Sequence, residues 1–194
     1  SLDIKLIEKI KKDLPELPDQ KKERFIKDYS LSAYEANVLV SEKEISDYFE
    51  EVVKTSDIKL AKNWIMGDFF ASLNEKNISI SESPVTAKKM SQLIDSISSG
   101  TISGRTAKEV FEIMKETGEE PNKIIESKGL QQKSDPKELE GIIDNVISEN
   151  KDKVEQYKSG KDKLFGFFVG QVMKVSGGKA NPQLVNDILK KKLK

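Results

Sequence analysis

The sequence has no histidine and no cysteine among its 194 residues. These absences exclude zinc fingers, zincin sites, disulfide scaffolds and nucleophilic sites of the Ser-His-Asp or Cys-His kind. They leave carboxylate and lysine chemistry open. An absence of cysteine beside many lysines is typical of a reducing cytoplasm, so we expect a cytoplasmic protein.

Glycine and proline are scarce, with 11 and 6 residues, which favours long regular elements over a turn-dense β fold. No segment reaches the roughly 18 consecutive apolar residues that a membrane span requires. The longest apolar stretch, residues 164–175, is interrupted by two glycines, Gln171 and Lys174. The chain also opens without a basic and then apolar leader, so we expect neither a membrane anchor nor a secretion signal.

Helical periodicity dominates the chain. Apolar residues between Leu2 and Leu14 recur on one face of a first helix, which Pro15 ends. Further helix starts are indicated by capping residues and helix-starting prolines, and helix ends by glycines at 100 and 118. The predicted starts are Ser32 with Glu35, Ser41 with Glu44, Asp57, Ser83 with Pro84, Ser103, Ser134 or Asp135, and Asn181 with Pro182. No alternation is long enough for a strand, so the predicted fold class is all-α.

A polar stretch, residues 126–136 (ESKGLQQKSDP), is the best candidate for a linker or hinge. It divides the chain into two predicted lobes, a bundle of short antiparallel helices over residues 1–127 and a small helical tail domain over 128–194. Apolar residues make up 36% and charged residues 34% of the chain, a ratio that suits a bilobed molecule better than a single sphere.

Charge is distributed unevenly between the two ends of the chain. Residues 151–194 hold 11 lysines and 4 acidic residues, a net charge of +7. The preceding 150 residues hold 22 basic and 29 acidic residues, a net charge of −7. The neutral total therefore conceals a basic tail, which is the first indication of function.

Two glycine turns in this tail carry lysines and flank one apolar helix. Such turns can present backbone N–H groups beside ammonium groups, a cradle for phosphates. The alternative is that these lysines are merely solvated. The sequence GGKA lacks the GxxxxGK[ST] spacing of a P-loop, so nucleotide hydrolysis is not expected here. The predicted nucleic-acid-binding residues are Lys158, Gly160, Lys161, Lys163, Lys174, Gly178 and Lys179.

Other conspicuous residues are predicted to have structural roles. Gly166 and Gly170 are expected to let a neighbouring helix approach closely, and Trp64, Phe69 and Phe70 to lie in the core rather than stack on bases. The acidic residues of the first lobe fall on solvent faces, and their spacing does not converge on a site. We therefore predict no catalytic centre, no metal site and no cofactor within this chain.

The tail run GKDKLFGFFVGQVMKVSGGKANP resembles the C-terminal signature of the GatB family, the B subunits of bacterial Asp/Glu-tRNA amidotransferases. The similarity continues in order through LPELPDQKKERFIKDYSLSAYEANVLVSEKEISDYFEEV, KLAKNWIMGDF, SGTISGRTAKEVFEIM and GLQQKSDPKEL. It covers nearly the whole chain. The last lobe also resembles the free-standing YqeY-like proteins.

This resemblance implies a helical connecting domain and a YqeY-like tail domain that hold tRNA-Gln or tRNA-Asn, with the seven tail residues above as the RNA-facing candidates. The family works with GatA and GatC as a glutamine-hydrolysing, ATP-dependent ligase that amidates Glu-tRNA-Gln or Asp-tRNA-Asn. Its ATP and Mg²⁺ site lies in a large N-terminal domain, and the resemblance implies that this chain starts after that domain. The linker would then let the tail swing.

Two other interpretations stay open at this point. The acidic lobe could be a protein-docking module beside an incidentally basic tail, or the chain could be a free-standing YqeY-like adaptor. Docking would use exposed apolar residues, whereas RNA binding needs the tail lysines together on one surface.

Overall fold

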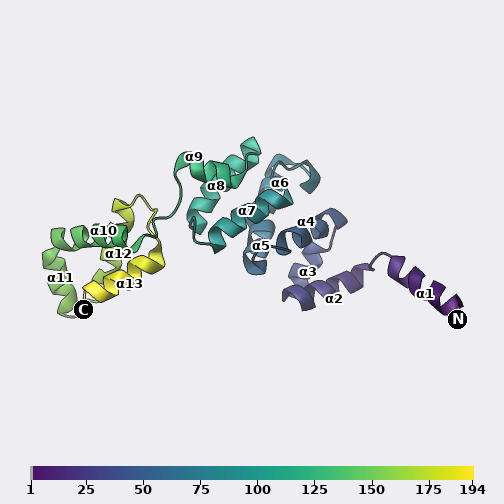
Figure 1. Cartoon of the computed structure of the whole chain (residues 1–194), viewed down its shortest axis with the longest axis horizontal. Helices are drawn as coiled ribbons and strands as arrows, with labels where there is room; N and C mark the ends of the chain where they lie inside the picture. Colours follow the sequence, from purple (N-terminus) through teal and green to yellow (C-terminus); the bar gives the residue numbers. More distant parts are fainter. Residues whose placement is uncertain (1) are drawn as a thin grey trace. The chain divides into compact units, whose positions relative to one another are not determined.

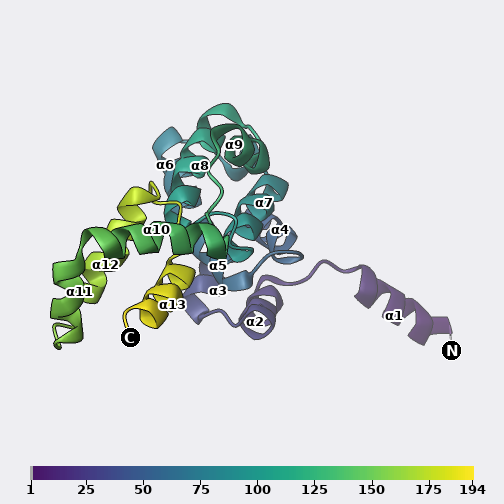
Figure 2. The same cartoon turned by 60° about the vertical axis from the view of Figure 1, so that its left-hand side comes forward.

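A computed structural model describes residues 2–194, with the side chains described from Asp3 onward. Contacts within the chain divide it into two compact units, one that ends at Ser83 and one that begins at Pro84. The described residues form helices and no strand, which confirms the all-α fold class (Figures 1 and 2). None of these helices is both long and apolar enough to cross a bilayer.

The first unit is a series of short helices in which α2 packs on α3 and α4 packs on α5. Its elements are α1 (Leu2–Asp13), α2 (Pro18–Tyr29), α3 (Ala33–Leu39), α4 (Lys43–Val53), α5 (Ile58–Trp64), a π-helical turn η1 (Ile65–Phe69), α6 (Phe70–Lys76) and a short 3₁₀ turn η2 (Ile80–Glu82).

Aromatic side chains form much of the core of this unit. Phe25 of α2 and Phe49 of α4 are fully buried, and their ring centroids lie 5.7 Å apart. Tyr48 stacks on the buried Phe69 at 4.8 Å. Trp64 is 7% exposed, so Trp64 and Phe69 are buried as predicted. Phe70 is half-buried and lines a pocket, so the prediction that it lies in the core is wrong.

The second unit contains a group of three mutually packed helices, α7 to α9, followed by the tail helices. Its elements are α7 (Ala87–Ser98), α8 (Gly104–Thr117), α9 (Pro121–Lys128), α10 (Pro136–Glu149), α11 (Lys151–Lys158), α12 (Leu164–Val175) and α13 (Pro182–Lys192). The tail has a hydrophobic core of its own, built by α10, α12 and α13 around the fully buried Phe168 and Val172.

Several predicted helix starts are confirmed by side-chain caps. The hydroxyl of Ser32 accepts a hydrogen bond from the N–H of Glu35 at 3.1 Å, and the Glu35 carboxylate accepts one from the N–H of Ser32 at 2.8 Å. This reciprocal pair is a capping box. Asp57, Ser103, Asp135 and Asn181 likewise accept from backbone N–H groups at the starts of α5, α8, α10 and α13.

Two predicted helix starts are wrong. Ser41 does not cap α4, which begins at Lys43 with Glu42 at the cap position; the Ser41 hydroxyl donates instead to the carbonyl of Val38 at the end of α3. Ser83 and Pro84 do not begin α7, which starts at Ala87 with Thr86 as its cap. In both places the cap position is taken by a later residue, Glu42 for α4 and Thr86 for α7.

The predicted linker is shorter than expected. Residues 126–128 form the end of α9, and Gly129 ends that helix with a φ of +59°. The segment after it is held on both sides. The N–H of Gln132 donates to the carbonyl of Thr101 at 2.6 Å, and Lys133 exchanges backbone hydrogen bonds with Lys179 and Asn181 at 2.6 and 3.1 Å. The domain boundary proposed at 127/128 differs from the division at Ser83 and stays a prediction.

Candidate nucleic-acid interface

The predicted RNA-facing residues fall into two groups at the two ends of α12. Lys158 ends α11, and Gly160, Lys161 and Lys163 lie in the turn that joins α11 to α12. Lys174, Gly178 and Lys179 lie at and beyond the far end of α12. Twelve helical residues with a rise of 1.5 Å each separate the two groups by about 18 Å. The structure therefore does not bring all seven residues together.

The turn before α12 depends on Gly160, whose φ of +111° lies in a region that L side chains rarely adopt. Lys158, Lys161 and Lys163 around it are all exposed. Lys161 makes a long contact of 3.4 Å with the amide oxygen of Gln156. Among the described residues, no carboxylate forms an ion pair with any of these three lysines, so their charges face solvent.

The second group belongs to a cleft of about 550 Å³ within the second unit. Lys174 at the end of α12, Lys179 before α13 and Arg105 in the first turn of α8 all line this cleft, together with one acidic residue, Glu109. Arg105 and Lys174 are exposed, and no ion pair involves either of them in the part of the chain that the structure describes. Two cationic side chains are therefore available to a ligand in the cleft.

Lys179 makes a structural contact within the chain, and its predicted contact with RNA stays a prediction. It is half-buried, and its ammonium group donates to the carbonyl of Gly129 at 2.7 Å. This hydrogen bond joins the turn before α13 to the segment after α9, fifty residues earlier in the sequence. Lys179 thus shapes the cleft, while Arg105 and Lys174 present its free charges.

The expected cradle of free backbone N–H groups is wrong. In the turn before α12, the N–H groups of Gly160, Lys161 and Asp162 donate to carbonyls of the same chain at 3.0 to 3.2 Å. In the turn after α12, Gly177 and Gly178 donate to the carbonyls of Lys174 and Met173 at 3.1 and 2.8 Å. Because these donors are already used within the chain, phosphate contacts here have to come from side chains.

The predicted packing role of Gly166 and Gly170 is also wrong. Both glycines are exposed, and a Cβ atom added to either would meet nothing within 4 Å. The helix is instead held by its opposite face through Phe168 and Val172. The glycine-bearing side of α12 therefore faces solvent and lies between the two groups of lysines.

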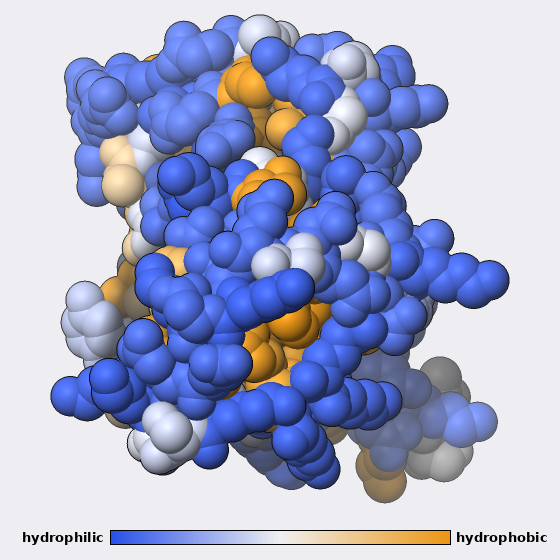
Figure 3. All heavy atoms as spheres, turned by 90° about the vertical axis from the view of Figure 1, so that its left-hand side faces the viewer, coloured by the Kyte–Doolittle hydropathy of each residue, from blue (hydrophilic) through white to orange (hydrophobic). Residues whose placement is uncertain are grey.

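The surface of the tail is hydrophilic. In the space-filling view from the side of α10–α13, hydrophilic residues cover most of the face, and hydrophobic atoms show only in gaps between them (Figure 3). Val175 is the one strongly exposed large hydrophobic residue between Pro136 and Lys194, at 62%. This surface is suited to a charged, solvated ligand such as a nucleic-acid backbone.

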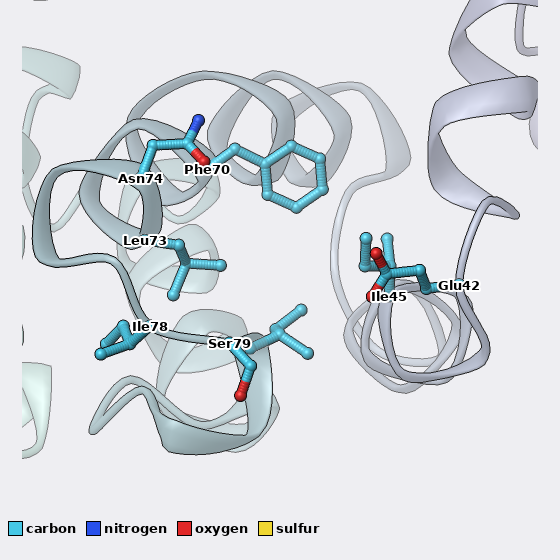
Figure 4. Close-up of a pocket in the computed structure, with 8 residues that line it drawn as sticks. Glu42, Ile45, Phe70, Leu73, Asn74, Ile78 and Ser79 are labelled. Atoms are coloured by element: carbon cyan, nitrogen blue, oxygen red, sulfur yellow. The ribbon is translucent and has the colours of Figure 1, made fainter.

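A pocket in the first unit has the opposite character. It encloses about 320 Å³ between α4, α6 and η2, and Ile45, Phe70 and Leu73 point into it (Figure 4). Glu42 is the only charged residue in its lining. A pocket without cationic groups offers no electrostatic attraction to phosphate. Among the described residues, no cluster of three or more acidic side chains could hold a metal ion.

Sequence comparison assigns the chain to a known family. The model of the GatB domain matches residues 47–193, about three quarters of the chain. The chain belongs to the GatB domain family. The resemblance predicted from the sequence motifs is thereby confirmed.

Curated relatives of the family match almost the whole chain. Proteins named as the B subunit of aspartyl/glutamyl-tRNA(Asn/Gln) amidotransferase are 61% identical over 191 residues in Pelagibacter ubique and 53% identical over 194 residues in Thioalkalivibrio sulfidiphilus. The match with Ehrlichia ruminantium is 53% over 192 residues. These alignments cover 96–99% of this chain but only 39–41% of the relatives, so the chain spans about two fifths of their length and corresponds to their C-terminal part.

Arg105 is the residue that the sequence interpretation missed. It lies in the SGRTAK motif, close to the cap of α8, and about 70 residues before Lys174. Only the packing of the second unit places it in the same cleft as the tail lysines. The local signal was present, since a basic residue in the first turn of a helix is disfavoured by the helix dipole and suggests a partner with negative charge.

Proposed function

We propose that this chain is the tRNA-holding part of the GatB protein of an amidotransferase and that it grips the phosphate backbone of a tRNA through its second unit. The observation that carries the proposal is the cleft in which Arg105 and Lys174 present unpaired charges, at the C-terminal end of α12 in a tail with a net charge of +7. The exposed lysines before α12 provide a second contact region.

The chemistry supports backbone binding rather than base reading. Lysine and arginine side chains neutralise phosphates and release condensed counterions, which gives affinity without sequence information. No aromatic side chain lines the cleft, so bases have no platform on which to stack there. Folded RNA is mostly recognised by its shape and its single-stranded loops, and two basic regions about 18 Å apart suit an RNA surface that runs along α12.

The proposed wider role follows from the names of the relatives. As part of GatB, the chain would hold Glu-tRNA-Gln or Asp-tRNA-Asn while the complete enzyme, with GatA and GatC, amidates the attached amino acid using ATP. The part of the relatives beyond this chain would supply ATP and Mg²⁺ binding, and the chain itself would contribute no catalytic group. We propose that this takes place in the cytoplasm.

The test is a titration of the full-length protein with tRNA-Gln, tRNA-Asn and an unrelated tRNA at 50 and 200 mM salt. One variant removes the free charges of the cleft (Arg105→Gln with Lys174→Gln), and another removes those of the turn (Lys161→Gln with Lys163→Gln). A matched control, Lys88→Gln with Lys123→Gln, removes the same charge from exposed positions of the second unit outside the cleft.

Each lost phosphate contact lowers the slope of log K against log salt by about 0.9. Removing two contacts should therefore shrink the affinity loss between 50 and 200 mM salt by about 12-fold, with little change in the control. If both regions hold the same RNA, the changes in log K caused by the two double variants should be additive when the variants are combined. Unchanged slopes in both variants would contradict the proposal.

Amidation kinetics provide a second readout. A positioning surface away from the chemistry should raise KM for the aminoacylated tRNA and leave kcat unchanged. A fall in kcat at unchanged KM would place these residues in the catalytic step instead.

A further inference from the structure

Exposed apolar residues concentrate on one helix. Of the strongly exposed large hydrophobic side chains, most lie between residues 4 and 17, on α1 and the segment after it. They are Ile4 (65%), Leu6 (57%), Ile7 (52%), Ile10 (51%), Leu14 (61%) and Leu17 (61%). We call this set the α1 stripe.

The stripe is a face rather than a scatter. At 100° per residue, Leu6, Ile7, Ile10 and Leu14 fall within about a third of the helix circumference, and Lys5 and Lys12 lie on the opposite side. Every described residue of α1 is exposed, and α1 stands apart from α2–α6 of its own unit in both ribbon views (Figures 1 and 2). A helix of 12 residues is marginal in water by itself, so its apolar face needs a partner.

The chain after α1 is fixed to the body of the first unit. Arg24 of α2 donates two hydrogen bonds to the carboxylate of Glu16 at 2.7 and 2.9 Å, and two to Glu50 of α4 at 2.7 and 2.8 Å. Prolines at 15 and 18 stiffen the same segment. The connection therefore restricts where α1 can lie, which is the arrangement expected of a helix that joins two folded bodies.

We propose that the α1 stripe docks onto the remainder of the full-length protein, the part of about three fifths of the relatives' length that lies outside this chain. The alignments include α1 and leave that part unmatched, and the match identifies this chain as C-terminal, so the absent part directly precedes α1. In the full-length protein, that preceding part is joined directly to α1. It can therefore cover the apolar face at a lower entropic cost than a separate molecule can. The inference does not depend on RNA binding.

Hydrogen exchange of the α1 amides in the full-length protein, without other subunits or RNA, tests this proposal. The variant Ile7→Gln with Ile10→Gln removes the centre of the stripe, and Lys5→Gln with Lys12→Gln makes the matched change on the opposite side. Glutamine has a better helix propensity than isoleucine, so a loss of protection in the first variant reports lost docking. We expect α1 to exchange at least about 100-fold faster in the first variant and within about threefold of wild type in the second.

Cross-linking identifies the occupant. Lys9 and Lys11 lie at the edges of the stripe, and Lys5 and Lys12 lie on the opposite side of α1. Cross-links from these four lysines should lead to residues outside the present chain. Cross-links only to residues 84–194, or only between isotopically distinct copies, would overturn the proposal in favour of the second unit or of a dimer. Protection that arises only after the other subunits are added would overturn it in favour of a separate partner.

Discussion

The Arg24 network is the most direct test of how the first unit is held together. Arg24 forms bidentate pairs with both Glu16 and Glu50, and the hydroxyl of Tyr29 donates to Glu50 at 2.8 Å. The side chains of Arg24, Glu16 and Glu50 are 33%, 31% and 27% exposed, so these ion pairs are neither fully exposed nor fully buried. We predict that Arg24→Met, which keeps an unbranched apolar stem and removes the guanidinium group, destabilises the unit.

The magnitude follows from this burial. Exposed ion pairs contribute about 0–1 kcal/mol, and hydrogen bonds to charged groups in less exposed positions about 1.5–3 kcal/mol. For the more enclosed pair of Arg24 with Glu50 we expect about 1–2 kcal/mol, and for the pair with Glu16 less than about 1 kcal/mol. Arg24→Met should therefore lower the free energy of unfolding by about 2 kcal/mol.

Urea unfolding followed by tryptophan fluorescence measures this loss, because Trp64 is the only tryptophan and is buried in the first unit. A double-mutant cycle with Glu50→Gln isolates the pair and should give a coupling energy of about 1–2 kcal/mol. A coupling energy below about 0.3 kcal/mol would refute the argument that this ion pair stabilises the fold.

The pH dependence provides an independent check. Hydrogen bonds from Arg24 lower the pKa of both Glu50 and Glu16. A lowered pKa contributes stability that is present above the ordinary carboxyl range and is lost as the pH falls through the folded-state value. The difference between wild type and Arg24→Met should therefore shrink below about pH 4. At the alkaline end, burial and the hydrogen bond to Glu50 raise the pKa of Tyr29 to about 12, so its contribution is lost between about pH 10 and 12.

Four further substitutions concern the tail. Gly166→Ala and Gly170→Ala should each stabilise the tail by about 0.5–1 kcal/mol, because alanine is the better helix former and both sites face solvent. Thermal unfolding measures this gain, and a destabilised variant would mean that the glycine packs against a neighbouring group. Gly160→Ala should cost about 1–3 kcal/mol, because alanine strains a φ of +111°, and denaturant unfolding measures the cost. Phe168→Ala should cost about 3–5 kcal/mol in the same assay, because the ring is fully buried in the tail core; a loss below about 1 kcal/mol would mean that the core collapses around the gap.

Features that depend on a few adjacent residues were predictable from the sequence. The capping box of Ser32 and Glu35 and the start of α13 at Asn181 involve side chains and N–H groups within three residues of one another. Ser41 shows the limit of such patterns. Ser41 has the same spacing to Glu44 as Ser32 has to Glu35, yet its hydroxyl donates to the carbonyl of Val38 in the preceding helix. No rule based on neighbouring residues tells these two serines apart.

Features that depend on packing between distant segments were not predictable. Nothing in the GxxxG spacing of Gly166 and Gly170 says which side of α12 faces the core, and Phe168 decides it. The free N–H groups expected in the glycine turns are used within the chain, because a turn that closes a helix satisfies the helix's own carbonyls first. The position of Arg105 beside Lys174 follows from the tertiary arrangement of the second unit.

These corrections change how the basic tail is expected to work. A cradle of backbone N–H groups would hold one phosphate rigidly, whereas the structure offers flexible ammonium and guanidinium groups in two regions about 18 Å apart. Long basic side chains can follow a phosphate backbone that shifts, and losing one of them weakens the grip without abolishing it. The apolar surface, in contrast, gathers on α1 and is almost absent from the tail. Because the exposed apolar side chains gather on α1 and the net charge of +7 lies in the tail, α1 is suited to a permanent protein contact and the tail to the proposed contact with an RNA that binds and leaves.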